Sequence, residues 1–458
     1  MVVLDMLVVV TALNTIRLDL GASIEQLEWT INAFTLSFAI LLMPASAFGD
    51  RLGRKRLFIA GLGLFTVASA ACALAPNSGL LITARAVQGV GSAMIMPHAM
   101  ALLGVAFRPE QRAKALGIFS SITGLGILGG PLVGGAITEG LNWQWIFWLN
   151  VPIGLLLMSL SKGRLEESTG TPRGLDFGGL VLVTAGVFGL VWGLMRGNAA
   201  GWTSLEVSGA LAAGALLTIA FVVWELRARE PMLPMRFFRS TAFSAGNAAG
   251  FLLFGATFGA AFFIAQFLQT TLHYGPLGAG IRLAPWTVTV FFMSAIAGSM
   301  VNRIGERPLI VSGLTLQAAG FGWIALIASP DLDYLAMIAP LVVAGCGVAL
   351  AIPTAQNAVL GAVPRPAVGA AAGVFNTLRQ LGGTFGIAIL VAVFSGSGSY
   401  ASPDAFNDGF TPAIWVAACL SLAAAIIGLW TPGRRSPETP MPATREPVLQ
   451  AESQMANP

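Results

Sequence analysis

The chain has 458 residues, of which 55% are hydrophobic and 10% are charged, and its mean hydropathy is +0.78. A soluble domain has about a quarter of its residues charged, so the composition excludes a soluble protein and predicts a surface that mostly faces lipid. The net charge of +4 does not indicate nucleic-acid binding, because the basic residues lie in loops between apolar segments.

Apolar segments long enough to cross a bilayer recur along nearly the whole chain. We expect fourteen spans, near residues 1–16, 29–48, 57–76, 79–105, 115–138, 145–161, 177–195, 207–224, 241–269, 280–300, 308–329, 334–360, 368–394 and 411–430. The first run begins at Met1 without a polar flank, so we expect an N-terminus that is cut short or wrongly assigned. The tail 432–458 is rich in Pro, Glu, Thr and Ser and is expected to be disordered.

The charges of the loops orient these spans. If the N-terminus is cytoplasmic, the inside loops and the tail hold 20 of the 25 Lys and Arg residues, and the outside loops hold Arg17, Arg196 and Arg282. This bias predicts a multi-pass protein of the inner (cytoplasmic) membrane with both termini in the cytoplasm. It does not separate fourteen spans from twelve, because removing spans 177–195 and 207–224 together leaves every other loop on its side.

The sequence contains an internal repeat. Residues 50–64 (DRLGRKRLFIAGLGL) match 302–316 (NRIGERPLIVSGLTL), the small residues of 89–97 recur at 345–353, and Gly117 and Phe119 recur as Gly373 and Phe375. Three matches in the same order predict two copies of one six-helix unit.

The repeat predicts an all-α membrane fold of two six-helix bundles. We expect an N-terminal bundle at 1–161, a linker at 162–240 that carries spans 7 and 8, and a C-terminal bundle at 241–431. Parallel repeats of this kind place the substrate site at their interface near the bilayer midplane, and transport occurs by rocking one half against the other.

Three ionisable residues, Asp5, Arg85 and Arg379, stand out inside predicted spans. Such a group costs about 2.5–3.5 kcal/mol at mid-bilayer on insertion scales, which makes it a functional candidate. We expect Asp5 to load and unload a proton; the alternative is a carboxylate at the inner interface. Arg85 has Leu341 as its counterpart in the second copy, and this asymmetry favours a functional role; the alternative is a buried salt bridge to a carboxylate.

Further polar residues are candidates for the cavity between the halves. In span 368–394, Asn376, Arg379 and Gln380 lie at positions i, i+3 and i+4 and so share one helix face. That face either looks into the cavity or packs on the opposite half. We add Asn32 and Gln88 as cavity candidates.

The predicted fifth span contains GLGILGGPLVGG at 124–135. Proline removes a helix hydrogen bond and glycine admits a close neighbour, so Pro131 with its flanking glycines predicts a kink, a tight packing seam or both. The stretch contains six glycines, of which Gly126, Gly130, Gly134 and Gly135 are our candidate site residues.

Several other chemistries have no support in the sequence. Cys72, Cys346 and Cys419 lie in apolar runs without metal-ligand spacing, and neither His98 nor His273 belongs to a recognisable metal set. GxxxxGK[ST], the loop that cradles nucleotide phosphates, does not occur, so we do not expect ATP as the energy source. We expect no metal, no cofactor and no enzyme activity.

The motifs together resemble the major facilitator superfamily, specifically its fourteen-helix drug/proton antiporter branch. The resemblance covers the whole chain and rests on GDRLGRKR at 49–56, RAVQGVG from Arg85, GILGGPLVGG ending at Gly135, WQWIFWLNVPIG from Trp143 and FNTLRQLGG from Phe375.

The resemblance implies roles for individual residues. It implies that Asp50 and Arg54, within the loop that also holds Gly49, Arg51 and Gly53, help latch the halves in the outward-facing state. It implies that Arg85 takes part in proton transfer, and that Gly130, Pro131, Gly134 and Gly135 bend span 5 to limit leak. Asp5 matches the carboxylate of the branch's first-span motif, although Leu7, Val10 and Asn14 replace its usual Thr, Asn and Pro.

We therefore expect proton-coupled efflux of amphipathic or cationic drugs or antibiotics by a monomer. The expected partners are the small-molecule substrate, protons and the lipid bilayer. Uptake of a small metabolite by proton symport on the same fold is the alternative, because fold does not fix direction. A non-transporting scaffold or sensor is a third hypothesis, disfavoured because the chain lacks a soluble partner domain.

Overall fold

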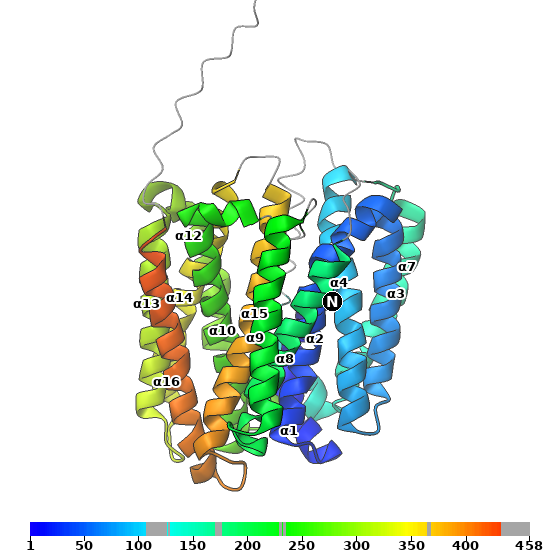
Figure 1. The fold of residues 1–458 in the computed structure, drawn as a ribbon. Coiled ribbons are helices and arrows are strands. Elements are labelled where there is room, and N and C mark those ends of the chain that lie inside the picture. Colours follow the sequence, from blue (N-terminus) through cyan, green and yellow to red (C-terminus); the bar gives the residue numbers. More distant parts are fainter. Residues whose placement is uncertain are drawn as a thin grey trace, which may run out of the picture.

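The computed structural model describes residues 1–106, 126, 129–169, 176–228, 231, 235–363 and 368–431. Every regular element within these ranges is helical (Figure 1). Among the described residues, eleven helices are long and apolar enough to cross a membrane, or 12 when the bent pair Ile24–Leu42 and Pro44–Leu52 counts as one span.

The helices of the first part of the chain follow the predicted spans within a few residues. They are α1 (Val2–Leu20), α2 (Ile24–Leu52), α3 (Arg54–Ala73), α4 (Ser78–Ala106), a helix at 129–140, α6 (Trp145–Trp148) and α7 (Asn150–Arg164). The later helices are α8 (Phe177–Ala200), α9 (Leu205–Arg227), the 3-10 helix η1 (Met235–Arg239), α10 (Thr241–Thr270), α11 (Pro276–Arg282), α12 (Ala284–Ile304), α13 (Glu306–Ile327), α14 (Tyr334–Gly361), α15 (Val368–Ser397) and α16 (Pro403–Gly428).

The predicted count of fourteen spans is not confirmed. Helix α1 is not among the counted spans, and it carries Asp5, Arg17 and Asp19. The predicted span 115–138 lies partly outside the described residues, as does the tail 432–458 that was predicted to be disordered.

Two of the predicted spans differ from the observed helices, one in its start and the other in its continuity. Helix α2 begins five residues before the predicted span 29–48, because Ser23 and Gln26 form a capping box: Ser23 Oγ accepts from the Gln26 N–H and Gln26 Oε1 accepts from the Ser23 N–H. The predicted span 280–300 is divided into α11 and α12 at Leu283.

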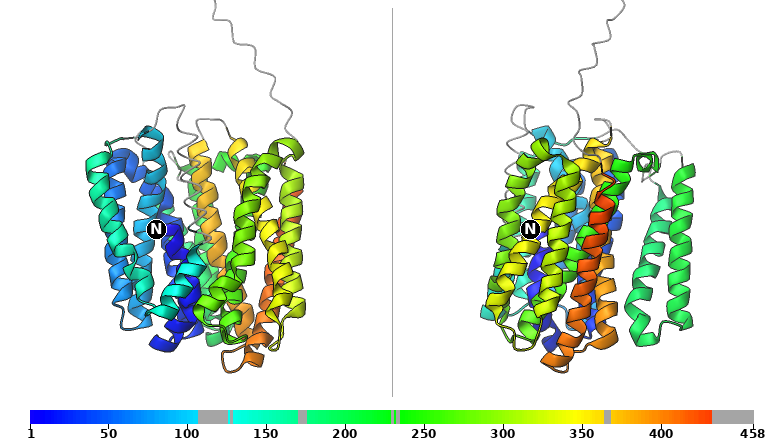
Figure 2. Two further views of the ribbon diagram at one scale, coloured as in Figure 1. Left: turned by 180° about the vertical axis from the view of Figure 1, so that it is seen from behind. Right: turned by 90° about the vertical axis from the view of Figure 1, so that its left-hand side faces the viewer.

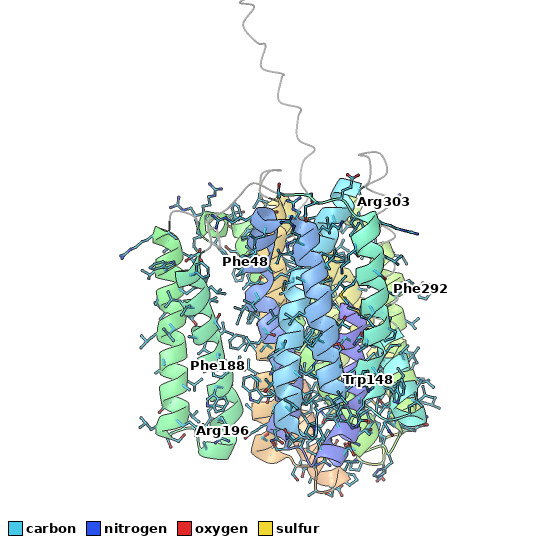
Figure 3. The ribbon with its side chains drawn as sticks, turned by 90° about the vertical axis from the view of Figure 1, so that its right-hand side faces the viewer. Phe48, Trp148, Phe188, Arg196, Phe292 and Arg303 are labelled. Carbon is cyan, nitrogen blue, oxygen red and sulfur yellow. The ribbon has the colours of Figure 1, made fainter. Side chains whose placement is uncertain are left out.

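The helices run side by side along one axis in two groups (Figures 1 and 2). One group contains α1–α4 and α7, and the other contains α10–α16; α2 packs against α15 between them. Helices α8 and α9 form a hairpin at the edge of the bundle (Figures 2 and 3), where α8 packs on both α2 and α15.

The repeated glycines have a structural reason. In α3 and α4, Gly61 and Gly91 face one another so closely that a Cβ on Gly61 would lie 3.0 Å from the Gly91 carbonyl oxygen. The second copy repeats this approach, because a Cβ on Gly313 of α13 would lie 2.8 Å from the carbonyl oxygen of Gly347 on α14. Close helix crossings of this kind use small residues to bring two backbones into contact.

Candidate functional site

Asp5 lies in the interior of the bundle. The chain begins about halfway along the bundle axis (Figure 1), and α1 runs from there to one end. The side chain of Asp5, in the first turn of α1, is 1% exposed. This position differs from the alternative interpretation, in which Asp5 was a carboxylate at the inner interface.

Arg85 of α4 forms a buried ion pair with Asp5. Its Nη1 lies 2.5 Å from Asp5 Oδ2, and Arg85 is also 1% exposed. Arg85 Nε donates to the carbonyl oxygen of Thr30 at 3.0 Å, and the guanidinium carbon lies 4.3 Å from the ring centroid of Phe34. The structure therefore brings together the two residues that the sequence predicted separately for proton coupling.

Three uncharged side chains complete the polar group around Asp5. Gln88 Nε2 donates to Asp5 Oδ1 at 3.0 Å and to Ser69 Oγ at 2.8 Å, and Gln88 Oε1 accepts from Arg85 Nη1 at 2.6 Å. Asn150 Nδ2, at the start of α7, donates to Asp5 Oδ1 at 2.7 Å. We call these five residues the Asp5 cluster: Asp5, Ser69, Arg85, Gln88 and Asn150.

The Asp5 cluster is arranged for a negatively charged carboxylate. Asp5 accepts from one guanidinium and two amide groups in an environment that excludes solvent. Breaking one partner out of such a buried pair costs about 3–5 kcal/mol, because the other charge is left uncompensated. Protonation of Asp5 removes the same attraction, so the cluster can respond to a proton with a change in its internal geometry.

Asn150 and Ser69 were not among the predicted site residues, although Asn150 is a polar residue inside the predicted span 145–161. Glu28 of α2, a second carboxylate that is 0% exposed, was not predicted either. The predicted span began at residue 29, so Glu28 was counted with the preceding loop. The capping box at Ser23 was the signal that would have included it.

The polar face predicted on α15 contacts neighbouring helices. The Arg379 guanidinium lies 5.2 Å from the ring centroid of Phe254 on α10, and Asn376 Nδ2 donates to the carbonyl oxygen of Ala372 in its own helix. Gln380 is 1% exposed. One turn further, Thr384 shares a hydrogen bond of 2.9 Å with Thr35 of α2. The cavity candidate Asn32 donates to Glu28 Oε1 at 3.3 Å.

The glycines of the fifth span form a tight seam with α1 and α11. A Cβ on Gly130 would lie 2.6 Å from Leu7 Cβ, and one on Gly134 would lie 2.6 Å from the Val8 carbonyl oxygen. A Cβ on Gly135 would lie 2.5 Å from the Pro276 carbonyl oxygen of α11.

The seam also involves Pro131 and Gly280. The Pro131 carbonyl oxygen occupies the space that a Cβ on Gly280 of α11 would need. Gly126 differs from the other motif glycines, because a Cβ there would meet Leu4 only at ordinary contact distance, 3.8 Å. Of the two predicted explanations of this motif, the packing seam is the one that these contacts describe.

Other contacts join the two groups of helices at the same end, which the loop charges predict to be the outer end. Gln269 Nε2 of α10 donates to the Thr11 carbonyl oxygen at 2.9 Å, and Glu139 Oε2 accepts from the Leu277 N–H at 3.0 Å. The Arg17 guanidinium lies 4.4 Å from the ring centroid of Tyr400. Burial raises the pKa of Tyr400, so its hydroxyl is protonated and donates to Gln266 Oε1. We call these contacts, with the glycine seam, the outer seam.

The predicted latch loop lies at the opposite end. Arg54 pairs with Asp50 of the same half, at 2.8 Å between Nη2 and Oδ1. Gly53 has φ +109°, a conformation that favours glycine, and a Cβ there would lie 2.7 Å from the Glu167 carboxyl carbon. Glu167 Oε1 accepts from the Lys55 N–H at 2.9 Å, so the loop is held on the segment after α7.

Two more residues of the loop have clear environments. Gly49 contacts the imidazole of His98, which occupies the space a Cβ would need, and Arg51 is exposed.

Among the described residues, no group of three or more His, Cys, Asp and Glu side chains is placed to hold a metal ion.

The family model of the Major Facilitator Superfamily matches residues 1–387 and 247–455. The chain belongs to this superfamily. Among curated members it is similar to the cephamycin export protein CmcT of Amycolatopsis lactamdurans, with 35% identity over 93% of this chain and 89% of that protein. It is also similar to the tetracenomycin C resistance and export protein of Streptomyces glaucescens, with 31% identity over 90% of this chain and 77% of that protein.

A further superfamily relative is the multidrug resistance protein Stp of Mycobacterium tuberculosis, with 33% identity over 86% of this chain and 74% of that protein. Among solved structures, an auto-inhibited POT family peptide transporter superposes with a TM-score of 0.69 over 96% of this chain and 97% of that chain, at 14% sequence identity. At this identity the likeness shows the fold alone, an all-helical fold shared with that transporter.

Proposed function

We propose that this superfamily member exports amphipathic or cationic drugs or antibiotics across the cytoplasmic membrane in exchange for protons. The observation that carries the proposal is the Asp5 cluster, a buried carboxylate and guanidinium halfway along the bundle. An ionisable pair at that depth is costly to maintain unless it is used. The names of the relatives support export: they describe proteins that export tetracenomycin C and cephamycin or resist several drugs.

Asp5 and Arg85 supply the coupling in this proposal. When the hydrogen bonds of the Asp5 cluster are formed, Asp5 is ionised and paired with Arg85. Its bonds to Arg85, Gln88 and Asn150 hold α1 against α4 and α7. A proton on Asp5 removes the ion pair and leaves Arg85 with its contacts to Gln88 and the Thr30 carbonyl. Because α1 also forms the outer seam, a change at Asp5 reaches the contacts that close the outer end.

The outer seam indicates which conformation of the alternating-access cycle this structure represents. Hydrogen bonds and a cation–π contact join the halves at the outer end, whereas Asp50 and Arg54 pair with one another at the opposite end. We infer an outer-closed conformation. The family resemblance assigns the latch role of the loop 49–56 to the outward-facing state. That role therefore belongs to the conformation in which the outer end is open.

The proposal includes the predicted topology. We propose fourteen spans, with α1 and the predicted span at 115–138 as two of them, both termini in the cytoplasm, and six-helix bundles at 1–161 and 241–431. Helix α8 packs on α2 and α15 at the edge of the bundle and α9 packs on α8, which supports the assignment of both to an insert within 162–240.

Inverted membrane vesicles with an acidic interior test this function. Adding a transported drug is expected to discharge the pH gradient in wild type. Arg85→Gln is expected to lose at least 90% of this response, a tenfold change that corresponds to about 1.4 kcal/mol. Arg196→Gln is the matched control, because Arg196 is a half-exposed arginine bound to Glu25 and Glu206. Equal responses of wild type and Arg85→Gln would contradict the coupling assignment. Accumulation of a metabolite in intact cells against its gradient would contradict the direction.

A further inference from the structure

Glu28 is a buried carboxylate without a cationic partner. It is 0% exposed, and its hydrogen bond comes from Asn32 Nδ2 to Oε1, at 3.3 Å. Its other oxygen, Oε2, is buried and has no hydrogen-bond partner in the described part of the chain. Asp5, in contrast, has a guanidinium and two amides on its carboxylate. The two buried acids of this half are therefore in opposite environments.

The direction of Glu28 follows from helix geometry. Thr35 of α2 faces α15, because its hydroxyl is hydrogen-bonded to that of Thr384. Glu28 precedes Thr35 by seven residues, which is about two helical turns, so both side chains lie on nearly the same face of α2. On α15, the residues one and two turns beyond Thr384 toward the outer end are Ala388 and Val391, which are buried and apolar.

The charged groups around this position do not neutralise Glu28. Glu25, one turn nearer the outer end, is paired with Arg196 of α8 at 3.4 Å. No Lys or Arg among the described residues lies within ion-pair distance, 4.0 Å, of the Glu28 carboxylate. The charged residues of the helices that pack on α2 are Asp5, Arg17 and Asp19 on α1, Arg54, Lys55 and Arg56 on α3, Arg85 on α4, Arg196 on α8 and Arg379 on α15.

We propose that Glu28 is a second proton-binding site, which must be protonated for the outer ends of α2 and α15 to close. An ionised carboxylate buried among apolar groups is strongly destabilised, whereas a neutral carboxyl with one amide partner is tolerated. Opening of the outer end separates α2 from α15 and gives Glu28 access to external water. Glu28 then takes up an external proton before the interface closes.

This site acts on the conformation of the empty transporter, although its place in a transport cycle rests on the proposed proton coupling. Acid favours the protonated carboxyl and hence the closed outer end. As the pH rises, ionisation of Glu28 favours the open outer end, in which water solvates the charge. The outer-closed population is therefore expected to fall with rising pH in the absence of substrate.

Spin labels at the outer end measure this population. The labels are placed at Leu18→Cys and Asp404→Cys, two exposed positions on α1 and α16, after Cys72, Cys346 and Cys419 are replaced by serine. In purified full-length protein without substrate, the open-to-closed ratio is expected to rise at least tenfold between pH 5 and pH 9.

Variants at Glu28 separate its contribution from that of other acids. Glu28→Gln is expected to keep the ratio within about twofold over the same range. Glu25→Gln, three residues away and half-exposed, is the matched control and is expected to retain the tenfold rise. Glu28→Met, which is neutral and apolar, is expected to behave like Glu28→Gln and serves if that variant does not fold. Glu28→Asp is expected to restore the rise.

Two results would overturn the proposal: a wild-type rise retained in Glu28→Gln and Glu28→Met, or an equal loss in Glu25→Gln. Because these distances are measured without drug, they do not depend on transport. A failure of drug–proton exchange with a normal Glu28 response would refute the proposed function alone, and the opposite result would refute the Glu28 site alone.

Discussion

Gly135→Ala is expected to open the outer end of the protein. The new Cβ would lie 2.5 Å from the Pro276 carbonyl oxygen and 2.6 Å from Leu277 Cα, which are backbone atoms of α11. Backbone cannot rotate away as a side chain can, so the helix at 129–140 and α11 must separate. Overpacking of this kind costs about 1–3 kcal/mol, which shifts the closed-to-open ratio by a factor of about 5–150.

The matched control is Gly129→Ala in the same helix, where a Cβ has no heavy atom within 4 Å. The control adds the helix propensity of alanine without a collision, so it is expected to leave the conformational ratio unchanged. The spin-label distance between positions 18 and 404 reports the outcome. Longer distances in Gly135→Ala than in Gly129→Ala agree with the seam, and identical distance distributions in the two variants would refute the role of this contact in closure.

Three further changes separate packing from charge. Gly53→Ala strains a position with φ +109° and brings a Cβ within 2.7 Å of the Glu167 carboxyl carbon; we expect a loss of about 1–3 kcal/mol of stability, seen as a lower melting temperature. Arg17→Ala removes the cation over the Tyr400 ring and is expected to lengthen the outer spin-label distance, whereas Arg17→Lys is expected to lengthen it less. Arg196→Gln removes solvent-exposed ion pairs, which contribute little, so transport is expected to stay within about twofold of wild type. A tenfold loss would show that the α8 contact is essential.

Hydrophobic segment length predicted most of the helices, because a span must bury its backbone hydrogen bonds within the bilayer. The bounds of α10, α14 and α15 differ from the predicted spans by three residues or fewer. The count was harder to establish from sequence, since the 19 residues of α1 include three that are charged. A break such as that at Leu283, between α11 and α12, leaves no gap in hydropathy and was not predicted.

The Asp5 cluster was only partly predictable. Asp5 and Arg85 were selected because a charge within an apolar span is expensive, and a buried salt bridge was the alternative interpretation of Arg85. Their pairing depends on how α1 crosses α4, which the sequence does not encode locally. Asn150 and Ser69 carry no charge, so the same rule gave them no weight. Glu28 was not predicted as a site residue because the predicted span began after it. The capping residues Ser23 and Gln26 indicate the correct helix start.

The most direct test of proton coupling is the number of protons that the purified protein releases when substrate binds. In a weakly buffered solution acidic enough for part of the population to carry a proton on Asp5, wild type is expected to release protons when a transported drug selects the form with the ionised, paired Asp5. Asp5→Asn lacks this proton and is expected to release fewer. Asp19→Asn is the control, because this exposed residue of α1 accepts a hydrogen bond from Trp143 that asparagine can also accept. Proton release that is equal in wild type and Asp5→Asn, at equal drug binding, would contradict the assignment of Asp5 as the coupling carboxylate.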